Sequence, residues 1–221
     1  AALAIGLDAF FGTGLSQAEL SAVARLGSGS ACRAVFGGFT TWAAGAKAAS
    51  EFLPADHWKE LRVIIVVLQQ TKKSVSSREG MERSRLTSPY YSSWIASSTE
   101  LFAEGCRALQ GRDIERLGWA MRQSYLAMFG TMFTADPPVI YWLPESVAVI
   151  RLCEQLRDAA VPVWETMDAG PQVKLVTLAS SVSAVTTAIR ERIPGAKTIV
   201  SAVGSGPTVT RDPGGRGEPD V

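Results

Sequence analysis

One short run of residues most restricts how this chain can fold. Residues 61–68 are apolar except for Arg62 and are rich in Val and Ile, which is typical of a strand buried inside a sheet. The run is much shorter than the roughly 18 apolar residues that a membrane span needs. We therefore predict a central β-strand here, not a transmembrane helix.

Further strands and helices are expected around this strand. The other predicted strands are residues 163–167, 173–178 and 197–203. The predicted helices are residues 97–109, 113–133, 145–160 and 180–192. A further helical stretch opens at Ser76, and Pro89 marks its kink or the restart of the next helix. These elements predict a four-helix, four-strand α+β unit that begins near Lys59.

The residues before Lys59 are expected to contain two helices, followed by a strand or a tightly packed turn into one from Cys32 to Trp42. Residues 1–11 are small and apolar, which is typical of a helix packed closely on a sheet. Ser16 and Glu19 form a capping box that begins a second helix, and Gly27 ends it. The residues expected on the buried face of this second helix are Leu20, Val23 and Ala24. Those expected on the buried face of helix 145–160 are Val147, Ile150, Cys153 and Leu156.

Composition narrows the classes of function. The formal net charge is +1, so nucleic acids and anionic membranes are not expected partners. The three cysteines are an odd number without C-x-x-C spacing, which argues against a disulfide framework or a zinc site and favours a reducing compartment. The sequence contains a single histidine, which argues against a His-based metal site and against Ser-His catalysis.

Two short segments carry the candidate chemistry. Ser28, Gly29 and Ser30 form a small-residue turn whose hydroxyl and N–H groups can bind a phosphate, and Arg33 can bind a carboxylate or phosphate through two parallel hydrogen bonds. Arg33 lies among apolar neighbours, so we expect it to have a buried partner. Asp168 precedes Ala-Gly-Pro at a predicted strand end, where a carboxylate can orient a hydroxyl or accept its proton. An ordinary turn after a helix and an Asp that caps its own turn remain the alternatives.

Other polar groups are weaker candidates. Ser76, Ser77, Arg78, Thr87 and Ser88 could line an anion site, but helix capping explains the hydroxyls equally simply. The pair Lys72-Lys73 is interpreted as a solvated strand end.

Six segments together resemble the diphosphomevalonate decarboxylase family, within the GHMP kinase superfamily. They are LGSGSACR at 26–33, FGGF at 36–39, VSSREGM at 75–81, TSP at 87–89, PPVIYW at 137–142 and DAGP at 168–171. The resemblance implies a GHMP-kinase-like two-domain α+β fold, with a truncated N-terminal domain at residues 1–58. It also implies a ferredoxin-like C-terminal sandwich with an antiparallel sheet at 59–207. Residues 208–221 are rich in Gly and Pro and are expected to be a mobile tail.

The resemblance also implies an activity. In that family, ATP phosphorylates the tertiary 3-hydroxyl of mevalonate 5-diphosphate, and phosphate then leaves as the carboxylate is lost as carbon dioxide, giving isopentenyl diphosphate. By matching position, Asp168 would be the catalytic carboxylate and Arg33 would hold the substrate carboxylate. Ser28, Gly29 and Ser30 would bind phosphate groups, with Thr87 a further candidate. ATP and Mg²⁺ are the implied cofactors, a cytoplasmic homodimer is the implied form, and no protein-based metal site is expected.

This sequence departs from the family pattern in two places. The family's phosphate loop is expected before Ala1, so residues 1–221 alone are expected to be inactive and to need a preceding N-terminal segment as a partner. An Asn-x-x-His segment typical of the family's long helix is replaced by Gln123-Ser-Tyr-Leu-Ala127. A related 3-hydroxyl kinase, a phosphomevalonate decarboxylase and an inactive binding or dimerisation module are the alternative functions.

Overall fold

The computed structural model describes residues 1–68 and 74–210. The expectation for Lys72-Lys73 and most of the expected mobile tail, from residue 211 on, lie outside the described residues. Contacts divide the chain into two compact units, Ala1–Lys59 with the residues from Val203 on, and Glu60–Ala202. The C-terminal segment 203–207 therefore packs with the first unit, where the Gly38 N–H donates a 2.8 Å hydrogen bond to the Gly204 carbonyl.

The first unit combines short helices with a two-stranded sheet. Its elements are α1 (Ala2–Phe11), α2 (Gln17–Gly27), the 3₁₀ helix η1 (Gly29–Val35), and the antiparallel pair β1 (Phe39–Thr41) and β2 (Ser50–Leu53). The predicted capping box begins α2, since the Glu19 N–H donates to the Ser16 hydroxyl and the Glu19 carboxylate accepts from the Ser16 N–H. Leu20, Ala24 and Val35 form the small core of this unit.

Two expectations for the first unit fail. Val23 was expected in the buried face of α2 but its side chain is 46% exposed. It lies roughly 80° around the helix from the middle of the strip that Leu20 and Ala24 define. The expected close packing of α1 on a sheet is also absent from the described residues, because α1 buries no residue and Phe10 and Phe11 are exposed.

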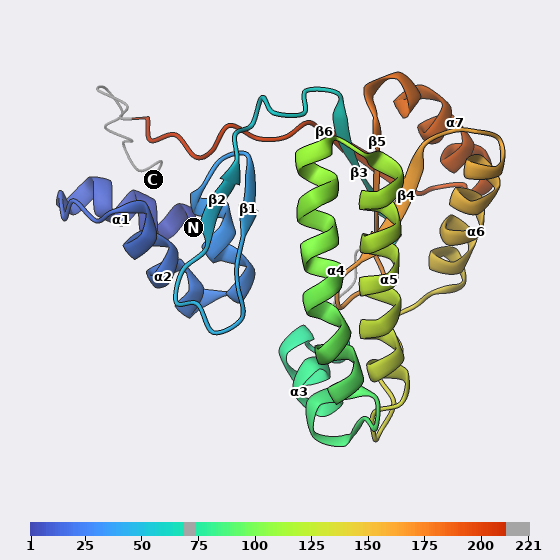
Figure 1. Cartoon of the computed structure of the whole chain (residues 1–221), viewed down its shortest axis with the longest axis horizontal. Helices are drawn as coiled ribbons and strands as arrows, with labels where there is room; N and C mark the ends of the chain where they lie inside the picture. Colours follow the sequence, from blue (N-terminus) through green and yellow to red (C-terminus); the bar gives the residue numbers. More distant parts are fainter. Residues whose placement is uncertain (69–73, 211–221) are drawn as a thin grey trace, which may run out of the picture. The chain divides into compact units, whose positions relative to one another are not determined.

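The second unit is built on a four-stranded antiparallel sheet (Figure 1). Its strands are β3 (Leu61–Val67), β4 (Val163–Met167), β5 (Val173–Leu178) and β6 (Lys197–Ser201), in the order β4-β5-β3-β6. The strand predicted from the apolar run is thus an inner strand, paired with β5 on one side and β6 on the other. The predicted α+β fold with an antiparallel sheet is confirmed.

Helices pack against this sheet. They are α3 (Ser77–Thr87), α4 (Tyr91–Gly111), α5 (Ile114–Phe133), α6 (Pro144–Asp158) and α7 (Val182–Arg192), with the 3₁₀ turn η2 (Ala179–Ser181) before α7. The predicted helical stretch at Ser76 is α3, and the predicted break at Pro89 separates it from α4. The helix predicted over 97–109 begins earlier than expected, at Tyr91. No helix among the described residues is long and apolar enough to cross a membrane.

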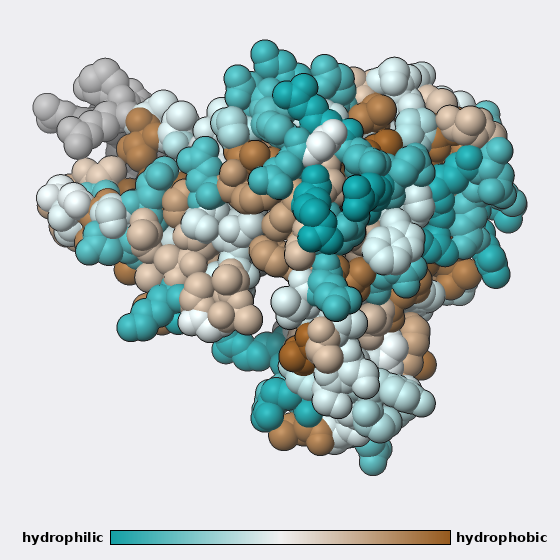
Figure 2. Space-filling view, in the orientation of Figure 1, coloured by the Kyte–Doolittle hydropathy of each residue, from teal (hydrophilic) through white to brown (hydrophobic). Residues whose placement is uncertain are grey.

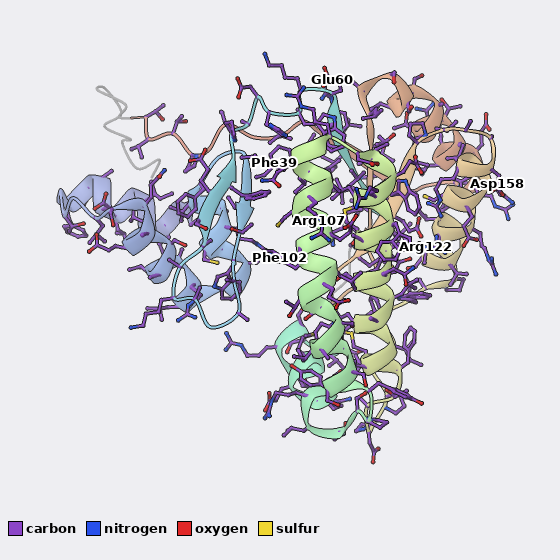
Figure 3. The ribbon with its side chains drawn as sticks, in the orientation of Figure 1. Phe39, Glu60, Phe102, Arg107, Arg122 and Asp158 are labelled. Carbon is purple, nitrogen blue, oxygen red and sulfur yellow. The ribbon has the colours of Figure 1, made fainter. Side chains whose placement is uncertain are left out.

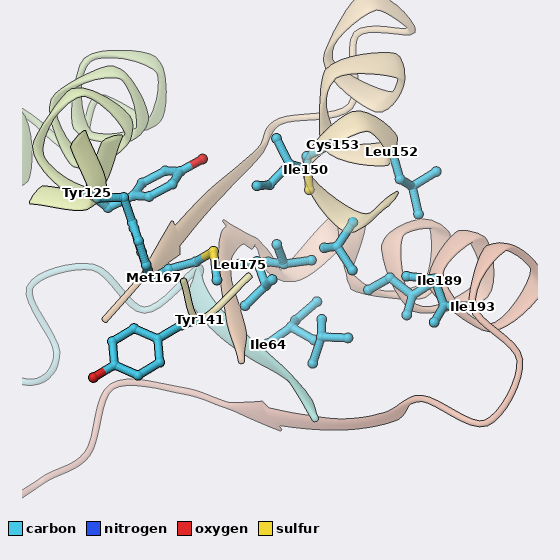
Figure 4. Close-up of a cluster of buried hydrophobic side chains, with 14 of the residues drawn as sticks. Ile64, Tyr125, Tyr141, Ile150, Leu152, Cys153, Met167, Leu175, Ile189 and Ile193 are labelled. Carbon is cyan, nitrogen blue, oxygen red and sulfur yellow. The ribbon is translucent and has the colours of Figure 1, made fainter. Parts of the chain in front are cut away.

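The main core lies between the sheet and the helices α5, α6 and α7. Figure 4 shows Ile64 and Leu175 of the sheet close to Ile150 of α6 and Ile189 of α7, and all four side chains are buried. Figure 2 shows the outer side of α6, at the right of the view, as mostly hydrophilic, so this helix is amphipathic. The core fixes both ends of the β4–β5 hairpin, which carries Asp168.

The predicted buried face of α6 is only half right. Ile150 and Cys153 are buried, but Val147 is 42% exposed and Leu156 is only partly buried. A spacing of three residues drifts by roughly 60° per step around an α-helix, so the outer two of four such residues turn away from the core.

Candidate functional site

The small-residue turn of the first unit, residues 28–30, is exposed to solvent and is supported by buried residues beneath it. Cys32 is buried, its thiol donates to the Gly29 carbonyl (3.0 Å), and its carbonyl accepts from the buried Ser21 hydroxyl (2.8 Å). Ser28 and Ser30 are exposed, with their hydroxyl oxygens 3.2 Å apart. The predicted phosphate-binding hydroxyls thus lie side by side on a supported turn, with the partly exposed Gly29 between them.

Arg33 does not have the buried environment that its neighbours suggested. In η1 the side chains of Cys32 and Val35 turn inward, whereas Arg33 is exposed, so the expectation of a buried partner is wrong. Arg33 instead lines an open cavity of about 510 Å³ within the first unit. The cavity is also lined by Ser30, Phe36, Gly38, Gly204 and Pro207. This arrangement leaves the guanidinium available to an anion.

Gly37 and Gly38 each allow another chain segment to approach closely beside this cavity. A Cβ on Gly37 would lie 2.5 Å from the backbone of Ser205, and a Cβ on Gly38 would lie 2.3 Å from the Leu53 carbonyl oxygen. Gly38 also has a φ of +68°, in the left-handed region. A side chain on Gly37 would collide with the C-terminal segment, and one on Gly38 would collide with the end of β2, which gives a physical reason for the FGGF segment.

Asp168 lies in the second unit, on the turn between β4 and β5. Its side chain is 77% exposed, and one carboxylate oxygen, Oδ1, accepts a hydrogen bond from the Lys174 ammonium on β5. The rest of the turn is buried, from Ala169 to Pro171, and the Gly170 N–H donates to the Asp168 carbonyl (2.6 Å). The turn therefore presents a carboxylate to solvent from a fixed backbone.

Distant segments hold this turn in place. The Ser77 hydroxyl at the start of α3 donates to the Ala169 carbonyl (3.1 Å), and the buried Ser146 hydroxyl of α6 donates to the Pro171 carbonyl (2.9 Å). The Tyr141 hydroxyl in turn donates to the carbonyls of Val75 (3.2 Å) and Ser76 (3.1 Å), just before α3. The VSSREGM, PPVIYW and DAGP segments of the sequence thus converge on one place within the second unit.

Thr87 lies at the other end of α3 from Ser77. Its hydroxyl donates to the Arg83 carbonyl and accepts from the Asp136 N–H, both at 2.8 Å. These bonds join the end of α3 to the turn after α5. A role for Thr87 in substrate binding stays a prediction, and its observed bonds are those of a helix terminus. The Ser76 hydroxyl likewise caps α3, accepting from the Glu79 N–H (3.2 Å).

The structure contains one cluster of charges that the sequence analysis missed. Glu165 on β4 is fully buried, and its carboxylate accepts hydrogen bonds from Arg122 of α5, Arg157 of α6 (2.7 Å) and the Tyr125 hydroxyl (3.2 Å). Figure 3 shows Arg122 on the side of α5 that faces α6, where it also bonds Glu154 (2.5 Å). The sequence did contain a signal for this cluster, since Glu165 lies in the middle of the buried face of the alternating strand β4.

The cluster changes the ionisation of its members. The hydrogen bond from Arg122 lowers the pKa of Glu154 below its usual value. Burial, reinforced by the nearby Glu165 charge, raises the pKa of the Tyr125 phenol far above its usual value. The same two causes raise the pKa of the buried Cys153 thiol, which makes it unreactive at neutral pH. The cluster therefore joins α5, α6 and β4 and does not resemble a site of acid–base chemistry.

Comparison with known protein families covers nearly the whole chain. Residues 63–211 match the mevalonate 5-diphosphate decarboxylase C-terminal domain, and residues 1–52 match the diphosphomevalonate decarboxylase-like N-terminal domain. The diphosphomevalonate decarboxylase of Eremothecium gossypii is 30% identical over 190 residues, which are 82% of this chain and 48% of that protein. The chain thus spans about half the length of this curated relative.

The fold is also similar to solved structures of this family. MDDEF in complex with MVAPP, AMPPCP and magnesium is 35% identical with a TM-score of 0.81, covering 88% of this chain and 61% of that chain. Mevalonate pyrophosphate decarboxylase from Streptococcus pyogenes is 31% identical with a TM-score of 0.84, covering 94% of this chain and 64% of that chain.

Proposed function

Since the chain belongs to the mevalonate 5-diphosphate decarboxylase family, we propose that the protein catalyses the ATP-dependent decarboxylation of mevalonate 5-diphosphate. The products are isopentenyl diphosphate, ADP, phosphate and carbon dioxide. The observation that carries the proposal is Asp168, an exposed carboxylate on a backbone turn that buried residues and two serine hydroxyls hold in place. The C-terminal domain match includes this turn.

Asp168 acts on the 3-hydroxyl of the substrate. Its carboxylate orients the hydroxyl and accepts the proton as the oxygen attacks the γ-phosphorus of ATP and the bond to ADP breaks. The new phosphate ester turns a poor leaving group into a good one. When the C–O bond breaks, phosphate leaves with its electron pair, and the electrons of the breaking C–C bond form the double bond as carbon dioxide departs.

Arg33 binds the carboxylate that is lost. The planar guanidinium can donate two parallel hydrogen bonds to a carboxylate and so fixes its orientation. Its exposure in an open cavity beside Ser30 supports this role. Ser28, Gly29 and Ser30 form the phosphate-binding part of the same unit, because their hydroxyl and N–H groups face solvent on a supported turn.

ATP brings its magnesium ion on its own phosphate groups. Mg²⁺ is usually bound through one or two carboxylates together with the phosphates of a nucleotide. Within residues 1–68 and 74–210, no group of three or more His, Cys, Asp or Glu side chains could hold a metal ion. When bound, the ion neutralises phosphate charge during transfer.

We further propose that the protein is a cytoplasmic homodimer. The family resemblance supports the dimer. Cys32, Cys106 and Cys153 are all free, as is typical of proteins in a reducing compartment.

The first test replaces Asp168 in the complete protein that contains this chain. Asp168→Asn keeps the shape of the side chain and removes its negative charge, so we expect kcat for ADP release to fall by about 10²–10⁴-fold. Asp158→Asn, at the exposed end of α6, is the matched control and keeps wild-type turnover. Wild-type protein that does not release carbon dioxide from mevalonate 5-diphosphate with ATP would refute the proposed function, and an active Asp168→Asn variant would remove Asp168 from it.

A further inference from the structure

The side chain of Lys174 forms a hydrogen-bonded ion pair with Asp168, the proposed catalytic carboxylate. Asp168 follows the last residue of β4, and Lys174 is the second residue of β5, paired with Thr166 across the hairpin. The Lys174 ammonium donates a hydrogen bond to Asp168 Oδ1. Because β5 is an inner strand, its backbone is fixed by hydrogen bonds to β4 and to β3, so Lys174 extends from a rigid base.

The exposures of the two side chains are unequal. Asp168 is 77% exposed, whereas Lys174 is only 25% exposed. An ion pair whose carboxylate is this exposed to solvent contributes little to the stability of a fold, typically less than about 1 kcal/mol. The main effect of the contact is therefore to restrict the carboxylate, which would otherwise adopt several rotamers on an exposed turn.

The proposed reaction creates an electrostatic difficulty at this position. The substrate carries a carboxylate and a diphosphate, and ATP adds further negative charge, so an isolated carboxylate would repel both. An ammonium group bonded to Oδ1 offsets the charge of Asp168 and leaves Oδ2 to accept the hydrogen bond of the substrate hydroxyl.

We propose that Lys174 is a positioning residue for Asp168 in the decarboxylase reaction. The proposal rests on the proposed function. Lys174 acts through Asp168: it holds one carboxylate oxygen, fixes the side-chain rotamer and lets an anionic substrate approach. It does not itself bind the diphosphate or exchange a proton with the substrate.

The test compares Lys174→Met, Lys174→Arg and a control, Lys197→Met, in the complete protein. Lys197 begins β6 at the far edge of the same sheet and is exposed. We expect Lys174→Met to lower kcat by about 10-fold or more, because the carboxylate is no longer positioned, and to raise KM for mevalonate 5-diphosphate, because the charge of Asp168 is no longer offset. Lys174→Arg restores most of kcat, since a guanidinium can donate to the same oxygen. All three variants keep the wild-type melting temperature.

A double-mutant cycle separates this role from a general effect of charge. In the Asp168→Asn background, Lys174→Met should cause no further loss, because the carboxylate through which Lys174 acts is gone. A Lys174→Met variant with wild-type kcat, or losses that multiply in the double variant, would overturn the proposal.

A second measurement does not depend on turnover. The ¹³C resonance of the Asp168 carboxyl group is compared in wild type, Lys174→Met and Lys197→Met. We expect it to move only in Lys174→Met, and an unchanged resonance overturns the proposal even if the wild-type protein has no decarboxylase activity. Inactivity of the wild type, in contrast, refutes the proposed function alone.

Discussion

At the scale of single residues, Ser146 shows how one buried hydroxyl can connect two parts of the fold. It accepts a hydrogen bond from the Leu143 N–H at the start of α6 (3.1 Å) and donates one to the Pro171 carbonyl in the Asp168 turn (2.9 Å). Its side chain is fully buried, so water cannot replace either bond. Ser146 therefore contributes both to stability and to the placement of the carboxylate.

Replacement of Ser146 by alanine should be costly. Ser146→Ala leaves the Leu143 N–H and the Pro171 carbonyl without this partner, and we expect the free energy of unfolding to fall by about 1–3 kcal/mol. Urea unfolding followed by circular dichroism measures this change. Ser183→Ala, at an exposed position of α7, is the control and should change stability by less than about 0.5 kcal/mol. A Ser146→Ala protein as stable as the control would show that the turn does not need this bond.

The predicted place of Asp168 at the end of a strand is confirmed, whereas the predicted surroundings of Arg33 are wrong. Asp168 follows directly from the end of an alternating strand and from the Gly-Pro turn, which are local signals. Arg33 was expected to be buried because its neighbours are apolar, but a 3₁₀ turn directs Cys32 inward and Arg33 outward. Apolar neighbours in a sequence do not fix the direction of one side chain.

At the scale of elements, the Glu165 cluster joins one strand to two helices. Arg122 of α5 bonds both Glu165 and Glu154, and Arg157 of α6 bonds Glu165 and lies 4.3 Å from the centre of the Trp164 ring. A buried carboxylate is tolerated only when it is paired and hydrogen-bonded, and here three donors satisfy it. The cluster thus specifies how α5 and α6 lie against β4.

The pH dependence of stability reports on this cluster. The Arg122 hydrogen bond lowers the pKa of Glu154 from the ordinary value of 4.5, so its contribution is present above that pH and is lost as the pH falls through the lowered value. Because Glu154 is partly exposed, we expect the contribution to be less than about 1 kcal/mol.

The measurement is urea unfolding of wild type and Glu154→Gln at several pH values between about 3 and 6. Glu154→Gln should lose less stability than wild type as the pH falls, whereas Glu191→Gln, an exposed control in α7, should follow the wild-type curve. Identical curves for wild type and Glu154→Gln would contradict the assignment of this contribution to the Arg122 bond.

Most elements were predictable because their signals are local. The limits of β4 and β5 agree with the prediction, as do the capping box of α2 and the break at Pro89. Which residues of a helix are buried was less predictable. Val23 and Val147 are apolar but exposed, since the direction of the core relative to each helix comes from packing and not from the helix sequence.

At the scale of the whole molecule, the main core belongs entirely to the second unit. Its buried members extend from Ile64 to Ile193 and come mainly from the strands β3, β4 and β5 and from the helices α5, α6 and α7. The hydrophobic cluster of the first unit is much smaller, with Leu20, Ala24 and Val35 as its buried members. The second unit therefore has the means to fold without the first.

We expect a fragment of residues 60–202 to fold cooperatively. Its thermal unfolding, followed by near- and far-ultraviolet circular dichroism, should show one transition seen by both signals. A fragment of residues 60–170, which lacks the inner strand β5, is the control and should show no near-ultraviolet signal. Non-coincident transitions, or an unstructured 60–202 fragment, would mean that the second unit depends on the rest of the chain.

The sequence by itself determined the elements, the α+β class and the chemical groups available for catalysis. Strand alternation, helix caps and proline breaks act over a few residues, so they can be recognised without the fold. Only the tertiary structure decided how the Asp168 turn is held. Ser77 lies 92 positions from Ala169 and Ser146 lies 25 positions from Pro171, and no local pattern pairs them. Such contacts arise from the packing of α3 and α6 against the ends of β4 and β5, a long-range property that depends on all of these elements at once.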